Sequence, residues 1–372
     1  MKVIHAVSVM NRAGQETFIM NVYRNINREE IQFDFQCSVH QTGDFDKEIE
    51  KLGGEILYLE PNKIKLPILK YIGDIVTHYK FFRKNTGYEV FHIHTYHAFD
   101  AWLSIVGAKM AGVKNICLHS HNTRGLHPGL HKFFRFLLNH MKITRFACSY
   151  AAGEWMYGEK YMRQGKAEVI KNGIQVSDFV FDKKRRESTR RSLAVENKFV
   201  VGHIGRFNYQ KNHTFLLQIF KKIKNEKENA VLLLVGTGEL KEEIEKQAEQ
   251  LGIKESVMFL GTRSDVIDIL FAMDIFVFPS LFEGLSVVAI EAQAAGTPIL
   301  TTDTLTQETK ITKCLQFCDL NAAPDVWASR AIELSKERHM NNAEDIKRAG
   351  YDIKVTAERL SEIYKEFMEK NR

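Results

Sequence analysis

This sequence of 372 residues lacks several features, and each absence excludes a class of protein. No apolar run reaches the roughly 18 residues that span a membrane, because Asp274 and Glu291 interrupt the most apolar stretches. Only six prolines occur and no tract is of low complexity, which is typical of an ordinary soluble globular protein. Neither a P-loop nor a G-x-S-x-G elbow is present. The first residues resemble a strand and lack the pattern of a signal peptide.

Cysteine is scarce and odd in number, with five residues at positions 37, 117, 148, 314 and 318. Most of them lie in apolar, strand-like runs, which is typical of buried free thiols in a reducing compartment. Cys314 and Cys318 have no companions at ligand spacing, so they make a poor metal site. We therefore expect a cytoplasmic protein.

Charge is unevenly divided along the chain. Residues 1–172 carry 23 Lys and Arg against 16 Asp and Glu (+7), whereas residues 173–372 carry 29 against 30 (−1). Two segments of the first part, 63–84 and 132–145, interleave basic and aromatic residues, a pattern typical of surfaces that contact an anionic membrane leaflet. The alternative is that the aromatic side chains face the core and the lysines are solvated. A peripheral position at the inner face of the membrane is therefore a second expectation.

Short apolar runs alternate with longer, helix-length segments throughout the chain, which predicts parallel sheets covered on both faces. The pattern restarts near residue 199, so we expect two Rossmann-like domains, 1–172 and 173–353, with a hinge at Asn172 and Gly173. The predicted strands are 2–8, 33–39, 55–59, 90–94, 115–120, 145–149, 167–171, 199–204, 230–235, 257–260, 275–279, 298–302 and 314–318.

The segment from Pro279 to Pro298 is the most informative part of the sequence. Gly284 suits a tight turn after a strand, and Leu285 and Ser286 are expected to open a helix whose free N–H groups bind phosphate. Glu283 then lies in the turn, and Glu291 lies about two helical turns farther on. Carboxylates in such places suit the vicinal hydroxyls of sugars. The layout predicts a site for a nucleotide-linked sugar.

The string PS-x-x-EG-x-S, followed by E-A and AAG-x-P, closely resembles the signature of glycosyltransferase family 4, which contains retaining enzymes of the GT-B fold. The resemblance covers nearly the whole chain. It implies an α/β fold of two Rossmann-like domains whose parallel sheets face each other across a cleft. The first domain would bind the acceptor, the second would bind the nucleotide-sugar, and a closing helix at 354–372 would pack back on the first.

The resemblance also assigns residues to the diphosphate. Arg206 ends a strand and Lys211 follows shortly after, matching the GR…KN element of the family. An arginine fork and a lysine point charge can together hold a diphosphate. The G-x-G loop at Gly236 and Gly238 would lie near the nucleotide, and Gly261 to Arg263, with Thr262 between them, would flank the base.

Gly14 follows the first strand, where it would let the backbone approach a phosphate or an acceptor closely. The family usually has two adjacent glycines here, so Ala13 departs from the pattern. His121, with Asn122 beside it, resembles the active-site histidine of the family. We therefore assign catalytic roles to His121 and Glu283.

Two patterns suggest metal binding. We interpret the histidines instead as residues that line strand ends, and the aspartates as an incidental match. Histidines recur as H-x-H at 92–94 and 119–121, but no cysteine or carboxylate lies nearby at ligand spacing. Asp44 and Asp46 form a D-x-D pattern in a polar loop without supporting elements. We expect no metal and no cofactor, since the nucleotide-sugar is a substrate.

The sequence thus predicts a metal-independent retaining glycosyltransferase of capsule or exopolysaccharide biosynthesis. It would transfer a sugar from a nucleotide-sugar, with UDP as the expected nucleotide, to a glycan or a lipid-diphosphate-linked acceptor. Two alternatives remain open. A nucleotide-sugar epimerase would convert the donor with no acceptor present, and a non-catalytic subunit would bind the donor without consuming it.

Overall fold

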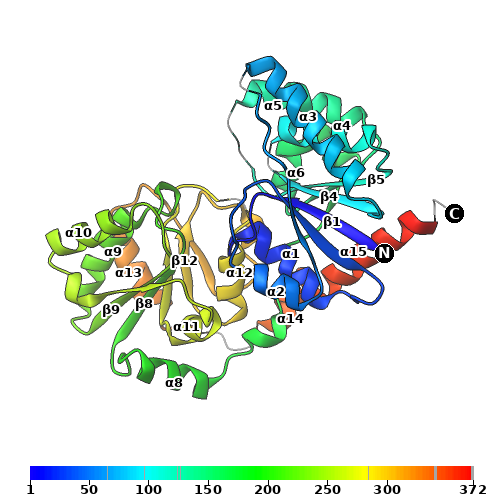
Figure 1. Cartoon of the computed structure of the whole chain (residues 1–372). Helices are drawn as coiled ribbons and strands as arrows, with labels where there is room; N and C mark the ends of the chain where they lie inside the picture. The colour runs from blue at the N-terminus through cyan, green and yellow to red at the C-terminus, as the bar shows by residue number, and fades with distance from the viewer. Residues whose placement is uncertain are drawn as a thin grey trace. The chain divides into compact units, whose positions relative to one another are not determined.

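The computed structural model describes residues 1–64, 66–95, 97–123, 125, 127–283, 285–338 and 342–369. Contacts between residues divide the chain into two compact units, one of Met1–Ile174 with Tyr351–Arg372 and one of Gln175–Gly350. Each unit is built around one parallel sheet with helices on both faces (Figure 1). All thirteen predicted strands are found in the described part of the chain, and the α/β fold of two parallel-sheet units is confirmed.

Unit one contains a seven-stranded sheet in the order β3-β2-β1-β4-β5-β6-β7. Its strands are β1 (Lys2–Val7), β2 (Gln32–Cys37), β3 (Ile56–Tyr58), β4 (Val90–Thr95), β5 (Asn115–Ser120), β6 (Thr144–Ala147) and β7 (Glu168–Val169). Its helices are α1 (Gly14–Asn25), α2 (Asp46–Lys51), α3 (Pro67–Lys84), α4 (Ala98–Met110), α5 (Pro128–His140), α6 (Tyr150–Tyr157), α7 (Glu159–Arg163) and α15 (Ile353–Glu369).

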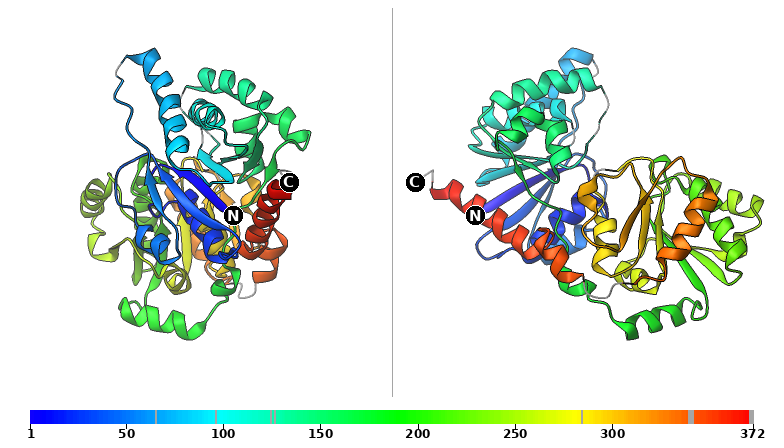
Figure 2. Two further views of the ribbon diagram at one scale, coloured as in Figure 1. Left: turned by 45° about the vertical axis from the view of Figure 1, so that its right-hand side comes forward. Right: turned by 180° about the vertical axis from the view of Figure 1, so that it is seen from behind.

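Alternation along the strands of unit one builds a separate core on each face of the sheet, because successive side chains of a strand point to opposite sides. Val3 and Phe33 share one apolar cluster with α1 and α15, whereas Ile4 and Phe91 share another with α3, α4, α5 and α6. Helix α15 lies beside the N-terminal strands in both views of Figure 2, and its buried Tyr364 belongs to the first cluster.

Unit two contains a six-stranded sheet in the order β10-β9-β8-β11-β12-β13. Its strands are β8 (Phe199–Ile204), β9 (Ala230–Val235), β10 (Val257–Gly261), β11 (Ile275–Phe278), β12 (Ile299–Thr302) and β13 (Leu315–Cys318). Its helices are α8 (Lys183–Ser192), α9 (His213–Glu226), α10 (Lys241–Gln250), α11 (Val266–Ala272), α12 (Val287–Ala294), α13 (Pro324–Leu334) and α14 (Ala343–Arg348). Phe220, Ile244 and Trp327 bring α9, α10 and α13 into one apolar core.

All five cysteines are buried thiols, as expected. No helix among the described residues is both long enough and apolar enough to cross a membrane.

The basic and aromatic segments are only partly a surface. In α5, Phe133 and Phe136 are 58% and 61% exposed, but Phe81 and Phe82 of α3 are buried in the core. Assigning Arg145 to a basic surface was wrong, because its side chain is buried and its guanidinium donates hydrogen bonds to the carbonyls of residues 138, 141 and 143. Carbonyls at the end of a helix lack partners within the helix, and Arg145 supplies them for α5.

Candidate active site

Most of the predicted donor-binding residues lie in the loops that follow β8, β9, β10 and β11 in unit two. All four strands run parallel, so these loops meet at one edge of the sheet, where open α/β sheets bind their ligands. Backbone hydrogen bonds join the loops to one another. Gly205 N–H donates to the carbonyl of Val235, Gly236 N–H to that of Gly261, and Leu281 N–H to that of Gln210.

Lys211 and Glu283 form an ion pair at the centre of this edge. Lys211 Nζ lies 2.7 Å from Glu283 Oε1, and the two side chains are only 15% and 8% exposed. Lys211 Nζ also lies 4.5 Å from the centre of the Phe278 ring, at the end of β11. Two residues that are 72 positions apart in the sequence are thus held together. A diphosphate that approaches Lys211 would meet a cation already fixed in place.

Arg206, in the loop that follows β8, is exposed. Its guanidinium lies 3.3 Å from Glu239 Oε2, with 70% and 56% of the two side chains exposed. An exposed pair of this kind contributes little to stability. The guanidinium can therefore exchange Glu239 for a phosphate at small cost.

The two glycines of the G-x-G loop are required by the backbone. Gly236 and Gly238 have φ angles of +136° and +155°, which disfavour residues with a side chain. A Cβ atom on Gly236 would lie 2.1 Å from the carbonyl oxygen of Gly205, and one on Gly238 would lie 2.4 Å from that of Phe207. These glycines hold the loop after β9 against the loop after β8. After β10, Thr262 is exposed.

Arg263 lies beside Thr262 and is held by its own neighbour in the chain. Its guanidinium forms two hydrogen bonds with the carboxylate of Asp265, at 2.8 and 2.6 Å. Asp265 therefore fixes the direction in which the Arg263 side chain leaves the loop.

Helix α12 begins slightly later than expected. Leu285 and Ser286 do not open the helix but precede it, with Ser286 as an extended N-cap, and both side chains are buried. Gly284 lies outside the described residues. Glu291 is on α12 and is partly buried, and burial raises the pKa of its carboxyl to about 7.

Gly14 is the first residue of α1 in unit one. A Cβ atom there would have no heavy atom within 4 Å, so neither packing nor backbone conformation explains this glycine. Two residues farther on, Glu16 is buried, which raises the pKa of its carboxyl to about 7. The sequence analysis gave Glu16 no role, although its position beside Gly14 could have suggested one.

His121 follows β5 and belongs to a cluster of five histidines on one face of the sheet. The rings of His5, His92, His94, His119 and His121 lie against one another, with centroids 4.3 Å apart for His92 and His94 and again for His119 and His121. Burial lowers the pKa of His5 and His121 to about 3. The cluster is therefore neutral near pH 7.

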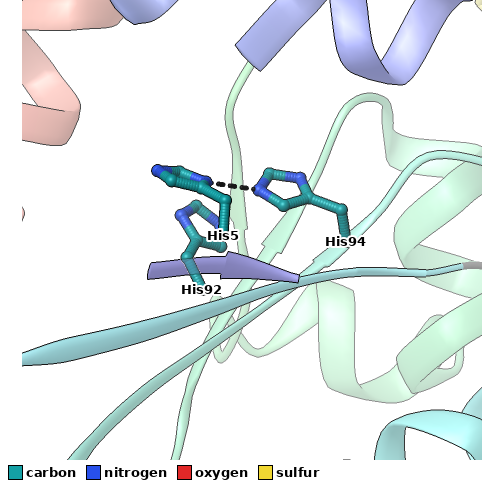
Figure 3. Close-up of side chains that lie close together, drawn as sticks. All are labelled: His5, His92 and His94. Carbon is teal, nitrogen blue, oxygen red and sulfur yellow. Dashed lines mark hydrogen bonds between the residues drawn. The ribbon is translucent and has the colours of Figure 1, made fainter. Parts of the chain in front are cut away.

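Two trios in this cluster bring their nitrogen atoms within 4.8 Å of one another, namely His5, His92 and His94, and His94, His119 and His121. Figure 3 shows the first trio, in which His5 and His94 are joined by a hydrogen bond. The sequence analysis noted the H-x-H spacing but missed His5 and the role of the closing helix. Tyr364 Oη of α15 lies 2.6 Å from His92 Nδ1, a pairing across 272 positions that no local pattern signals.

The D-x-D residues have structural partners. Asp44 accepts a hydrogen bond from the backbone N–H of Arg12, and the buried Asp46 accepts one from the N–H of Gly43. Both aspartates thus fix the loop that follows β2.

Asn172 and Gly173, the predicted hinge, lie in unit one near its boundary at Ile174. A Cβ atom on Gly173 would lie 2.7 Å from the Cα of Ile353, so a glycine here allows close approach to the start of α15. Asn172 is buried.

Comparison with known proteins points to one family. Residues 184–352 match the family described as "Glycosyl transferases group 1". The chain is 31% identical to the putative glycosyltransferase EpsF of Bacillus subtilis, with 100% of this chain and 98% of EpsF covered. It is 27% identical to the UDP-Gal:alpha-D-GlcNAc-diphosphoundecaprenol alpha-1,3-galactosyltransferase of Escherichia coli, with 63% and 62% covered.

The crystal structure of Anabaena Alr3699/HepE in complex with UDP-glucose has the same fold. It superposes with a TM-score of 0.75 at 18% identity and covers 98% of this chain and 100% of that one.

Proposed function

Because the chain belongs to the group 1 glycosyltransferases and is a transferase with the GT-B fold, we propose that it transfers a sugar from a UDP-linked donor to a glycan carried on a lipid diphosphate. The observation that carries the proposal is the largely covered ion pair of Lys211 and Glu283 at the edge of the unit-two sheet. Two similar proteins support the two substrate classes. The Escherichia coli relative uses UDP-Gal and a diphosphoundecaprenol acceptor, and the Anabaena protein binds UDP-glucose.

In this proposal, unit two holds the donor. Arg206 and Lys211 contact the diphosphate, while the backbone N–H groups of Leu285 and Ser286, before α12, contact a phosphate. Fixed cations and N–H dipoles stabilise the negative charge that develops on the leaving diphosphate. These cations can supply the charge that a divalent ion supplies elsewhere, so we propose catalysis without a metal.

Two carboxylates complete the donor site. Glu291 would accept hydrogen bonds from the ribose hydroxyls, and Glu283 would lie at the sugar. Lys211 then serves two groups, since it neutralises Glu283 and contacts the diphosphate. The loops that contain Gly236, Gly238, Thr262 and Arg263 would border the base.

Unit one would bind the acceptor, with Gly14 allowing close approach and His121 acting beside the reacting sugar. The pKa of His121 lies far below neutrality, so the imidazole acts in its neutral form as a hydrogen-bonding group. We propose retention of the anomeric configuration, as the family resemblance implies. The pathway we propose is assembly of a capsule or exopolysaccharide.

A lipid-linked acceptor requires that unit one approach a membrane. Exposed apolar side chains of α5 (Leu130, Phe133, Phe136) lie beside the exposed Lys132, which suits shallow insertion next to anionic headgroups. Asn172 and Gly173, near the boundary of unit one, would serve as the hinge.

The transfer test combines the purified chain with UDP-sugars and a short-chain lipid-diphosphate sugar, and measures the extended product by mass spectrometry. We expect product only when donor and acceptor are both present, and its loss in Glu283→Gln. Glu249→Gln, an exposed residue of α10, serves as the matched control and should retain activity. A new sugar isomer formed from the donor alone would indicate an epimerase. Binding of donor without turnover would indicate a non-catalytic subunit.

The membrane test measures flotation with anionic liposomes at low salt. We expect Phe133→Ser combined with Phe136→Ser to reduce flotation severalfold. Val326→Ser, which changes an exposed apolar residue of α13 in unit two, should have no effect. Equal flotation of all three proteins would contradict the assignment of this surface.

A further inference from the structure

Three of the five clustered histidines are joined by hydrogen bonds into a row, which we call the histidine row (His5, His94, His121). His5 Nδ1 lies 2.9 Å from His94 Nε2, and His94 Nδ1 lies 2.9 Å from His121 Nε2 (Figure 3 shows the first bond). Both nitrogens of His94 are thus used. At the two ends, His5 Nε2 and His121 Nδ1 are buried and have no hydrogen-bond partner among the described residues.

The row can exist in only two arrangements. A neutral imidazole carries one N–H and one bare nitrogen, and each hydrogen bond needs one of each. The position of the proton on one ring therefore determines its position on the other two. In the first arrangement His5 carries its proton on Nε2 and His121 has a bare Nδ1. In the second, His5 has a bare Nε2 and His121 carries a proton on Nδ1.

The surroundings of the two ends favour the second arrangement. His5 is 2% exposed, and its ring lies 4.2 Å from that of Phe33 and 5.9 Å from that of Phe35. A buried N–H without a partner is rarer in proteins than an unused acceptor, so a bare Nε2 suits this apolar site better. His121 follows the end of β5 and is partly exposed as a residue, although its Nδ1 is covered. This end of the row therefore lies nearer to solvent than His5 does, and a substrate acceptor would reach Nδ1 by displacing the groups that cover it.

We propose that His5 and His94 are positioning residues that hold His121 with its proton on Nδ1, so that it donates a hydrogen bond to a substrate oxygen. This inference rests on the proposed function of His121 and extends it by two residues. The position of the proton on His5 determines the tautomer of His94, and His94 in turn determines the tautomer of His121. Without them, His121 would sample both tautomers, and only one of these carries the proton on Nδ1.

The distances favour this row over a metal site in the same cluster. Two nitrogens bound to one tetrahedral zinc lie about 3.3 Å apart, since each Zn–N bond is roughly 2.0–2.1 Å. The two contacts of the row measure 2.9 Å, which is a hydrogen-bond length. A cation bound at His94 would displace a proton that one of these bonds requires.

The first experiment measures histidine tautomers in the resting enzyme by NMR of the 15N-histidine-labelled chain. Nitrogen chemical shifts distinguish a protonated Nδ1 from a protonated Nε2, and the signals of His121 are identified by their loss in His121→Gln. We expect the Nδ1–H form of His121 in the unchanged protein and a mixture of forms in His94→Phe. Because this measurement needs no substrate, it tests the row even if the proposed transfer reaction fails.

The second experiment separates positioning from structure by kinetics. We expect His94→Phe to lower kcat about tenfold or more, with the KM for the donor unchanged. His94→Gln should recover part of the loss, because an amide can accept from His5 and donate to His121. His119→Phe is the matched control, since its ring lies 4.3 Å from that of His121 outside the row, and it should retain the tautomer and kcat.

Three results would overturn the proposal. One is an Nε2–H form of His121 in the unchanged protein, and another is an equal loss of kcat in the His94→Phe and His119→Phe variants. The third is stoichiometric zinc that remains after dialysis and is lost in His94→Phe. If His94→Phe does not fold, the spectrum of the unchanged protein still decides the direction of the row.

Discussion

The raised pKa of Glu291 leads to a prediction about how nucleotide binding depends on pH. Burial raises the pKa of this carboxyl from 4.5 to about 7. If Glu291 accepts hydrogen bonds from both ribose hydroxyls, it must bind the nucleotide as a carboxylate. Binding would then strengthen as the pH rises through 7, because protonated enzyme must first lose its proton.

The size of the effect follows from the pKa. At pH 6 only about one carboxyl in ten is ionised, whereas at pH 8 about nine in ten are. UDP should therefore bind roughly tenfold more weakly at pH 6 than at pH 8, a difference of about 1.4 kcal/mol. Glu291→Gln should bind UDP weakly at both pH values, and the part of the pH dependence that is due to Glu291 should be absent.

Stability should change with pH in the opposite direction. The folded protein retains the Glu291 proton between pH 4.5 and 7, where the unfolded chain has lost it, so the free energy of unfolding falls as the pH rises through this window. The contribution reaches about 3 kcal/mol and is constant above pH 7. In Glu291→Gln the free energy of unfolding should no longer fall through this window, and the variant should be more stable than the unchanged protein at pH 8.

Isothermal titration calorimetry with UDP at pH 6, 7 and 8 measures the binding effect. The phosphates of UDP titrate identically in both proteins, so the difference between the unchanged protein and Glu291→Gln isolates the carboxyl. At pH 7, repeating the titration in buffers of different ionisation enthalpy should show about half a proton released from Glu291. Equal pH slopes for the two proteins would refute the assignment of Glu291 to the ribose.

Four further substitutions test the packing of the two units. Gly236→Ala should lower the free energy of unfolding by roughly 2–4 kcal/mol in urea, because its Cβ would lie 2.1 Å from the carbonyl oxygen of Gly205. A Cβ at position 14 would meet open space, so Gly14→Ala should change the free energy of unfolding by no more than about 0.5 kcal/mol while lowering kcat/KM. Equal stability of the two alanine variants would contradict this distinction. Lys211→Met should lower the free energy of unfolding by about 2–3 kcal/mol, because it leaves Glu283 unpaired. Adding Glu283→Gln should restore stability but not the affinity for UDP. Recovery of both would indicate that Lys211 does not contact the ligand. Arg145→Met should destabilise unit one by about 3 kcal/mol without changing liposome flotation. Unchanged stability with reduced flotation would indicate that Arg145 contacts the membrane.

Local sequence patterns were sufficient for the strands, whereas the candidate site was predicted from the family resemblance. Apolar runs of four to eight residues between helix-length segments identify buried parallel strands, because such strands are covered on both faces. The residues after β8 and β11, including Arg206 and Glu283, were named from the family motifs, and the parallel sheet explains why their loops meet at one edge. A helix start is less sharply encoded, and α12 begins at Val287, after Leu285 and Ser286.

The tertiary structure decided what depends on distant parts of the chain. Whether a basic or aromatic residue is buried depends on which helix packs over it, so the sequence could not separate the exposed Phe133 from the buried Phe82 and Arg145. The order of the strands brings His5, His94 and His121 into one row, and α15 adds Tyr364 to the same cluster from the other end of the sequence. Periodicity determines which residues lie in a strand and which face they occupy, because it acts over a few residues. The neighbours of that face are chosen by folding of the whole chain, because contacts between strands and helices far apart in sequence leave no local signal.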